Sequence, residues 1–270
     1  MRTLFLPAVF APFAAIAAQA ADMPIKARPL PPPAAFSWTG CHIGGNAGGK
    51  WATTSGSVDV AAANGVAGPT AAGSLPLAEG TLSSGIGGVQ LGCDYQMGAF
   101  VYGVEGDAEW GNWTASRIVP PPIAAAPFPF IPGDSFGISS RWENSVRSRI
   151  GYAWDRWMLY VTGGVSWINV RVDTNYIAAR LNGINFPAAV TSDSATLTGG
   201  TFGGGLEFAM TNNLIAGVEG RFAWYDGHTY NGGLLATSGF PPNGPFTFAP
   251  STTAVHMHTS RVVGRLSWKF

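Results

Sequence analysis

The chain has 270 residues, of which 37 are glycine and 20 proline, but only 11% are charged. Soluble domains usually carry about 25% charged residues, so this composition argues against a protein surrounded by water on all sides. Lysine plus arginine equals aspartate plus glutamate at 15 each, which provides no basic field for nucleic acid. Beyond the N-terminus there is no apolar run of about 18 residues, which argues against transmembrane helices. A transmembrane β-barrel is compatible with this composition, because the apolar residues of its strands occupy only every second position and form no long run.

The N-terminal segment has the features of an export signal. Residues 1–20 begin with Arg2, continue as an apolar, alanine-rich stretch and end in Ala18-Gln19-Ala20. This small-x-small ending is typical of signal-peptidase sites, so we predict a signal peptide over 1–20. Residues 21–35 are rich in proline and are predicted to form an extended periplasmic tail. The remaining 36–270 would form the barrel domain.

Segments with alternating apolar residues, aromatics and glycine are separated by segments rich in Pro, Ala, Gly, Ser and Thr. The alternation predicts antiparallel strands with two different faces. Eight strands are expected, over 36–51, 80–95, 99–113, 141–153, 157–173, 197–209, 213–230 and 255–270.

The lengths of the connections alternate strictly. Three are tight turns, at 96–98, 154–156 and 210–212. Four are long, at 52–79, 114–140, 174–196 and 231–254. Short periplasmic turns alternating with long external loops are typical of bacterial outer-membrane barrels. The predicted fold is therefore all-β: an eight-stranded, antiparallel, up-and-down transmembrane β-barrel with four long external loops and three short periplasmic turns.

The two faces of these strands differ in chemistry. Charges fall on one parity, while the other parity is apolar or glycine. Trp142 and Tyr152 bracket about 33 Å of strand at about 3.3 Å per residue, enough to cross an apolar band of about 25 Å when tilted. Seven aromatic residues are predicted to form girdles at the two edges of this band: Tyr95, Trp110, Trp142, Tyr152, Trp167, Phe208 and Trp224.

Fourteen charged residues are assigned to the barrel interior, seven of each sign. They are Asp94, Glu105, Asp107, Glu109, Glu143, Glu207 and Glu219, with Arg141, Arg147, Arg149, Arg221, Arg261, Arg265 and Lys269. An eight-stranded barrel is just wide enough for its side chains, and an unpaired buried charge is costly. We therefore expect a closed network of ion pairs and a plugged lumen.

These residues resemble the Omp25/Omp31-like outer-membrane protein family of alphaproteobacteria, also called the small porin family. The resemblance covers 21–270 and is carried by short motifs at 36–40, 43–46, 87–92, 103–107, 146–153, 159–164, 203–207 and 268–270. It implies an eight-stranded barrel with periplasmic termini. It also implies that Gly264, Leu266, Trp268 and Phe270 form the signal read by the barrel-assembly machinery. One departure is Cys41-His42, where the family usually has two aromatics.

The two cysteines are expected on adjacent strands near the periplasmic edge with the same outward parity. A disulfide between Cys41 and Cys93 in an oxidising compartment and two free lipid-facing thiols are both compatible with this placement.

Three motifs suggest other chemistry. Glu105, Asp107 and Glu109 could serve a glycosidase, but lumen acids facing arginines are the preferred interpretation. His256 and His258 could bind metal or belong to a lipid-modifying enzyme, but a plain surface role is preferred. The glycine run from Gly199 to Gly205 lacks the βαβ unit of a nucleotide site. No metal or cofactor is expected.

The predicted function is that of a structural, surface-exposed outer-membrane barrel supporting envelope integrity and external contacts. A narrow channel for small solutes and a lipid-modifying enzyme are the alternatives. The expected partners are outer-membrane lipids, lipopolysaccharide and the assembly machinery, with no nucleic acid and an external ligand that the sequence does not identify.

Overall fold

The computed structural model describes residues 36–61, 64–65, 68–69, 73–76, 80–119, 130–181, 184–238 and 247–270. The predicted signal peptide (1–20) and proline-rich tail (21–35) lie outside these residues. Within the described ranges, no helix is long and apolar enough to cross a membrane.

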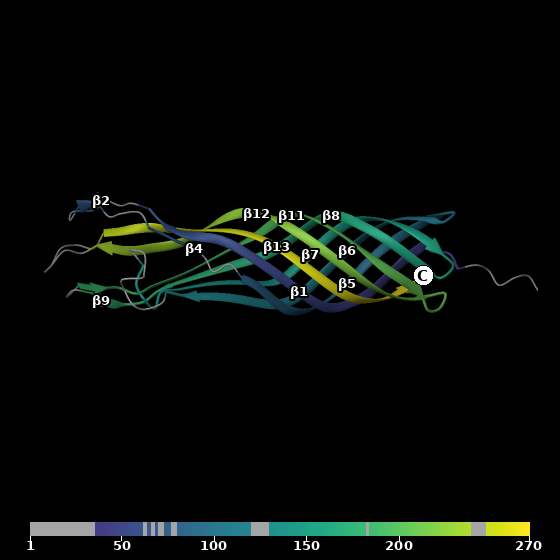
Figure 1. Cartoon of the computed structure of the whole chain (residues 1–270), viewed down its shortest axis with the longest axis horizontal. Helices are drawn as coiled ribbons and strands as arrows, with labels where there is room; N and C mark the ends of the chain where they lie inside the picture. Colours follow the sequence, from purple (N-terminus) through teal and green to yellow (C-terminus); the bar gives the residue numbers. More distant parts are fainter. Residues whose placement is uncertain are drawn as a thin grey trace, which may run out of the picture. The chain divides into compact units, whose positions relative to one another are not determined.

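Eight long strands follow one another around the sheet (Figure 1). They are β1 (Gly40–Val60), β5 (Gly80–Met97), β6 (Phe100–Ile118), β7 (Ser135–Trp154), β8 (Trp157–Tyr176), β11 (Ala189–Ala209), β12 (Leu214–Ser238) and β13 (Thr247–Lys269). Neighbouring strands pair antiparallel, and β13 also pairs with β1. The sheet is therefore closed, which removes its exposed edges.

The sheet has nine strands, one more than the predicted eight. The additional strand, β4 (Gly73–Pro76), pairs with residues 57–60 of β1. The described pairing of β5 with β1 ends at Thr54 and Gly80, so β4 continues the sheet beside β1 where β5 no longer does. Two further strand pairs are separate from the sheet: β2 (Asn64–Gly65) with β3 (Gly68–Pro69), and β9 (Ala179–Leu181) with β10 (Ile184–Phe186).

The three short connections lie at the predicted positions, between β5 and β6, β7 and β8, and β11 and β12. Gly98 and Asp155 have φ of 62° and 52°, a left-handed conformation that glycine adopts freely and Asp tolerates better than most residues. The start of β1 and the end of β13 meet at the same end of the sheet, where Phe270 N donates to Cys41 O at 2.9 Å. We call this the turn end, and the opposite end the loop end.

The strands extend further toward the loop end than predicted. Residues 52–60, 114–118, 135–140, 174–176, 189–196, 231–238 and 247–254 were expected in long loops but belong to strands. These segments carry few charges, only Asp59, Arg117 and Asp193, and their many Ser, Thr, Ala and Gly residues concealed the alternation. The predicted loop bounds are therefore wrong, while the order of short and long connections is correct.

The wall of the barrel reverses its polarity along its length. Near the turn end, the outward side chains are apolar, such as Leu91, Val104 and Leu159, each more than half exposed. Near the loop end, Val58, Phe136, Val172 and other apolar residues point inward, whereas β11 exposes Ser192, Ser194 and Thr196. The first half has the surface of a membrane-spanning barrel and the second half that of a barrel standing in water.

Candidate functional site

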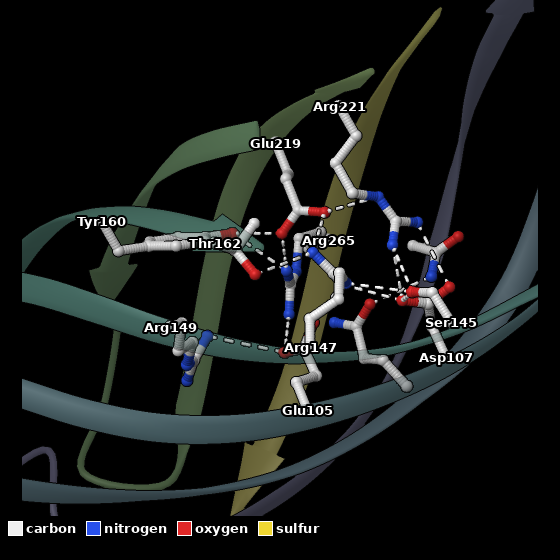
Figure 2. Close-up of polar contacts among 12 residues, drawn as sticks. Glu105, Asp107, Ser145, Arg147, Arg149, Tyr160, Thr162, Glu219, Arg221 and Arg265 are labelled. Atoms are coloured by element: carbon white, nitrogen blue, oxygen red, sulfur yellow. Dashed lines mark hydrogen bonds and ion pairs between the residues drawn. The ribbon is translucent and has the colours of Figure 1, made fainter. Parts of the chain in front are cut away.

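The interior of the turn-end half holds a ring of buried ion pairs, part of which Figure 2 shows. Its members come from seven of the eight long strands. The acids are Asp94, Glu105, Asp107, Glu109, Glu143, Glu207 and Glu219, and the permanent cations are Lys50, Arg147, Arg149, Arg221, Arg261 and Arg265. None is more than 7% exposed. The ring is the feature we regard as the candidate functional site.

Arg147 is the centre of the ring. Its Nη2 lies 2.7 Å from Glu105 Oε1 and 2.8 Å from Asp107 Oδ2, and its Nη1 lies 3.0 Å from Glu219 Oε1. The Nε donates to Ser145 at 3.0 Å. One guanidinium therefore joins β6, β7 and β12 across the lumen.

Toward the loop end, Arg221 lies 2.7 Å from both Asp107 and Glu109. Arg261 pairs with Glu109 and lies 3.1 Å from Glu143. Glu143 also pairs with Lys50 of β1. Each of these carboxylates accepts from more than one cation, which is the condition under which buried charges are tolerated.

Toward the turn end, Arg265 pairs with Glu105 and Glu219. Its Nη1 also donates to the Tyr160 hydroxyl at 2.9 Å. Arg149 pairs with Asp94 and lies 3.1 Å from Glu207. Charge-assisted hydrogen bonds of this kind are about twice as strong as neutral ones.

Two predicted members do not belong to the ring. Arg141 is exposed because the pairing of β6, β7 and β8 shifts register beside it, between Trp110 and Trp113 and between Ser139 and Glu143. Such a bulge turns two successive residues to the same side. Lys269 is only half-buried; it donates to the Ser37 carbonyl, and its Nζ lies 4.7 Å from the Phe36 ring.

Sequence reasoning missed two interior basic side chains of β1. Lys50 is 4% exposed and His42 is 2% exposed. The alternation that places Cys41 outward would have placed both inward. The His42 ring nitrogens face Asp94 Oδ2 at 3.5 Å and Glu105 Oε2 at 3.2 Å. A protonated imidazole donates from both nitrogens, and in that form His42 would match the seven acids with seven cations.

Apolar clusters lie on both sides of the ring. At the turn end, Trp38, Val101, Met158 and Ile215 are buried together. At the loop end, twenty buried residues form a larger cluster that includes Trp113, Phe136, Ile168 and Met257. The interior is thus layered: apolar, charged, then apolar.

The residues behind the enzymatic alternatives occupy other settings. Glu105, Asp107 and Glu109 all face arginines in the ring. His256 and His258 are exposed on the outer wall, and the His258 ring lies 6.1 Å from that of Phe222. Gly199 and Gly205 lie within β11, in the sheet. Among the described residues, no group of three or more His, Cys, Asp or Glu side chains is arranged to hold a metal ion.

The predicted outward residues lie on the outer wall. Tyr95, Trp110, Tyr152 and Trp224 are exposed, while Trp142, Trp167 and Phe208 are half-buried at the same outward parity. Gly264, Leu266, Trp268 and Phe270 are exposed at the end of the chain. Cys41 faces Cys93 in the β1–β5 register, and a disulfide joins them.

A closed antiparallel sheet with an apolar outer band, aromatic side chains on that band and an ion-paired interior is the construction of a bacterial outer-membrane β-barrel. The chain is 32% identical over 228 residues to the 31 kDa outer-membrane immunogenic protein of Brucella melitensis, covering 79% of the chain and 82% of the relative. It therefore belongs to the Omp25/Omp31-like family of alphaproteobacterial outer-membrane proteins.

Two other relatives cover about half of the chain. The 25 kDa outer-membrane immunogenic protein of Brucella abortus is 27% identical over 144 residues, 53% of the chain and 54% of the relative. The 22 kDa outer membrane protein of Rhizobium leguminosarum is 29% identical over 150 residues, 54% of the chain and 56% of the relative. All three names place the family in the outer membrane, where this protein is located. No family model matches the chain.

Two solved structures are distantly similar to the chain. The protease OmpT of Escherichia coli covers 87% of this chain and 98% of its own, with a TM-score of 0.46 and 9% identity. Ail of Yersinia pestis covers 84% of this chain and 99% of its own, with a TM-score of 0.31 and 11% identity. These similarities are too distant to transfer any activity.

Proposed function

We propose that this protein is a structural, surface-exposed barrel that supports the integrity of the outer membrane and makes external contacts, with a lumen closed to solutes. The observation that carries the proposal is the layered interior. A solute entering from the loop end would meet the apolar cluster of Trp113, Phe136 and Met257 first. It would then meet the ion-pair ring, and finally the cluster around Trp38.

The ring is costly to open. Moving Arg147 aside would leave Glu105, Asp107 and Glu219 with fewer cations in a buried setting. Removing one partner of a buried pair typically costs about 3–5 kcal/mol. Such an interior favours a rigid wall, not a water-filled path.

Loss of the protein tests the envelope role. A strain of the source organism lacking this protein should become more sensitive to detergent and to large antibiotics, and the wild-type chain should restore resistance. Unchanged sensitivity in the deletion strain would contradict the proposal.

Planar-bilayer recording distinguishes the closed lumen from the alternative of a narrow channel for small solutes. The reconstituted protein should give no conductance steps, with a general diffusion porin in the same bilayer as the positive control. Steps that scale with salt concentration would show a solute path and overturn the closed lumen.

The enzyme alternative depends on His256 and His258. Both side chains are exposed on the outer wall, which supports a non-enzymatic role. The test is the mass of lipid A in cells that produce the protein. A mass shift that disappears in His256→Ala or His258→Ala would establish the enzyme.

A further inference from the structure

The outward turn of Arg141 creates a feature on the outer wall that is separate from the ring. Ser140 and Glu143 are both interior, so the two residues between them, Arg141 and Trp142, both lie on the outer side. Without the bulge, Arg141 would point into the lumen and add a cation to the six Lys and Arg side chains of the ring. With it, a guanidinium lies beside an aromatic residue of the membrane edge.

Arg141 borders a depression of about 130 Å³ on β7, β8 and β11, together with Asn169, Arg171 and Ser194. Arg171 is held in place: its Nε lies 2.9 Å from Asp173 Oδ1, and its Nη2 donates to Ser192 at 2.9 Å. Asp173 is thereby occupied by Arg171. Within the described part of the chain, Arg141 forms neither an ion pair nor a hydrogen bond, so its charge is available to an anion.

A second hollow runs along the apolar wall of the neighbouring strands. It has a volume of about 420 Å³ and lies between Val89 and Leu91 on one side and Val146 and Trp167 on the other. Its floor is formed by the small residues Gly106 and Ala108 of β6. A groove with a small-residue floor and aliphatic sides fits an extended hydrocarbon chain.

The two hollows lie on one wall and at different depths. Asn112 of β6 borders a further depression that Arg141 and Asp173 also line. Four residues separate it from Ala108, or about 13 Å along the strand at about 3.3 Å per residue. The paired Trp110 and Trp142 lie between the groove and the arginines, where tryptophan marks the boundary between hydrocarbon and headgroups.

We propose that this wall binds one phosphorylated, acylated glycolipid of the outer leaflet. Its phosphate is held by Arg141 and the free edge of Arg171, and one of its acyl chains lies in the groove over Gly106. Arginine suits the role because its planar guanidinium binds phosphate oxygens in pairs. The proposal rests on the location in the outer membrane and is independent of the closed lumen.

Native mass spectrometry of the detergent-solubilised, full-length protein tests the site. The probes are bisphosphorylated lipid A, its dephosphorylated counterpart and inorganic phosphate. The variants are the double substitution Arg141→Gln/Arg171→Gln for the headgroup, and Gly106→Leu for the groove. A Cβ at Gly106 would have only Ser145 O nearby, at 3.7 Å, so leucine there fills the groove without displacing the wall.

Two control variants make the same kinds of substitution at positions outside the proposed site. Arg156→Gln removes an arginine at the turn end, and Gly220→Leu adds a side chain to another outward position, where the nearest atom to a Cβ is 4.0 Å away. The heat-induced gel shift of each variant confirms that it has folded.

The wild-type protein and both controls should retain one lipid A. The double variant and Gly106→Leu should each bind lipid A at least about tenfold more weakly. The double variant loses charge-assisted contacts with the phosphate, and Gly106→Leu loses the burial of the acyl chain. Equal retention of the dephosphorylated lipid, or unchanged retention by the double variant, would overturn the proposal. The proposal would also be overturned if inorganic phosphate displaced the lipid completely and Gly106→Leu had no effect. That result would indicate a site for anions alone.

Discussion

Arg147 of β7 reaches Glu219 of β12 at 3.0 Å between Nη1 and Oε1, although β8 and β11 separate the two strands in the sheet. Figure 2 shows this pair at the centre of the ring, with Arg265 and Glu105 beside it. The contact bridges the lumen directly. Strands that are not neighbours are thus tied together by side chains as well as by the closed ladder of backbone hydrogen bonds.

Arg147→Met should destabilise the folded barrel by about 3–5 kcal/mol, because it leaves the buried carboxylates of Glu105, Asp107 and Glu219 with fewer cations. Urea unfolding in detergent micelles, followed by tryptophan fluorescence, measures the change. Arg171→Gln is the control, since an exposed pair with Asp173 is worth about 0–1 kcal/mol. Equal effects of the two substitutions would contradict a stabilising ring.

Gly103→Ala should also be destabilising, by about 1–3 kcal/mol, because overpacking a filled interior forces its neighbours to move. The added Cβ would collide with Asp94 Oδ1 and lie 3.1 Å from Arg149 Cγ. Gly106→Ala, three residues along the same strand but outward, should change the free energy of unfolding by less than about 0.5 kcal/mol. The same urea titration compares them, and a neutral Gly103→Ala would mean that the interior has room.

Replacing both cysteines by serine should lower stability by about 4 kcal/mol, the chain-entropy value for a disulfide of this sequence separation. The bond encloses a separation of 52 residues. Peptide mapping without reductant should recover Cys41 and Cys93 in one cross-linked fragment. If both residues were recovered as free thiols from outer-membrane protein, the disulfide would be contradicted and the two cysteines would be lipid-facing thiols.

The contribution of Asp134 to the stability of the folded protein should increase as the pH falls. Burial raises the pKa of its carboxyl above 3.8, although the amides of Ile131 and Ile177 donate to it and partly oppose the shift. A raised pKa means that the folded form binds the proton more tightly, so stability is gained below the folded pKa and lost as pH rises through it. Carbon-13 NMR titration of Asp134 in micelles checks the midpoint. A midpoint at or below 3.8, with Asp134→Asn as the assignment control, would refute the shift.

Phe270→Ala should slow assembly without weakening the folded barrel. Phe270 is 69% exposed, so its ring contributes little to interior packing. Insertion into proteoliposomes containing the barrel-assembly machinery should fall, while the urea midpoint of the folded fraction stays that of wild type. Unchanged insertion would show that the terminal aromatic is not read as a signal in this chain.

The sequence by itself determined the class of fold, the positions of the short turns and most of the ring. These follow from local rules: side chains alternate with a period of two, and Gly or Asp marks a left-handed turn. Glu105, Arg147 and Glu219 could therefore be assigned to the interior one strand at a time. The same rule, applied to β1, would also have found Lys50.

Only the tertiary structure decided which charges meet, where the alternation breaks and where the strands end. Arg147 and Glu219 are 72 residues apart, and their contact depends on how the closed sheet places strands across the lumen. Arg141 leaves the interior because of a bulge imposed by the pairing of three strands. The strands continue into segments with few charges because the apolar side chains that they bury there face inward. The sequence shows which residues alternate but not what lies on each side of the wall.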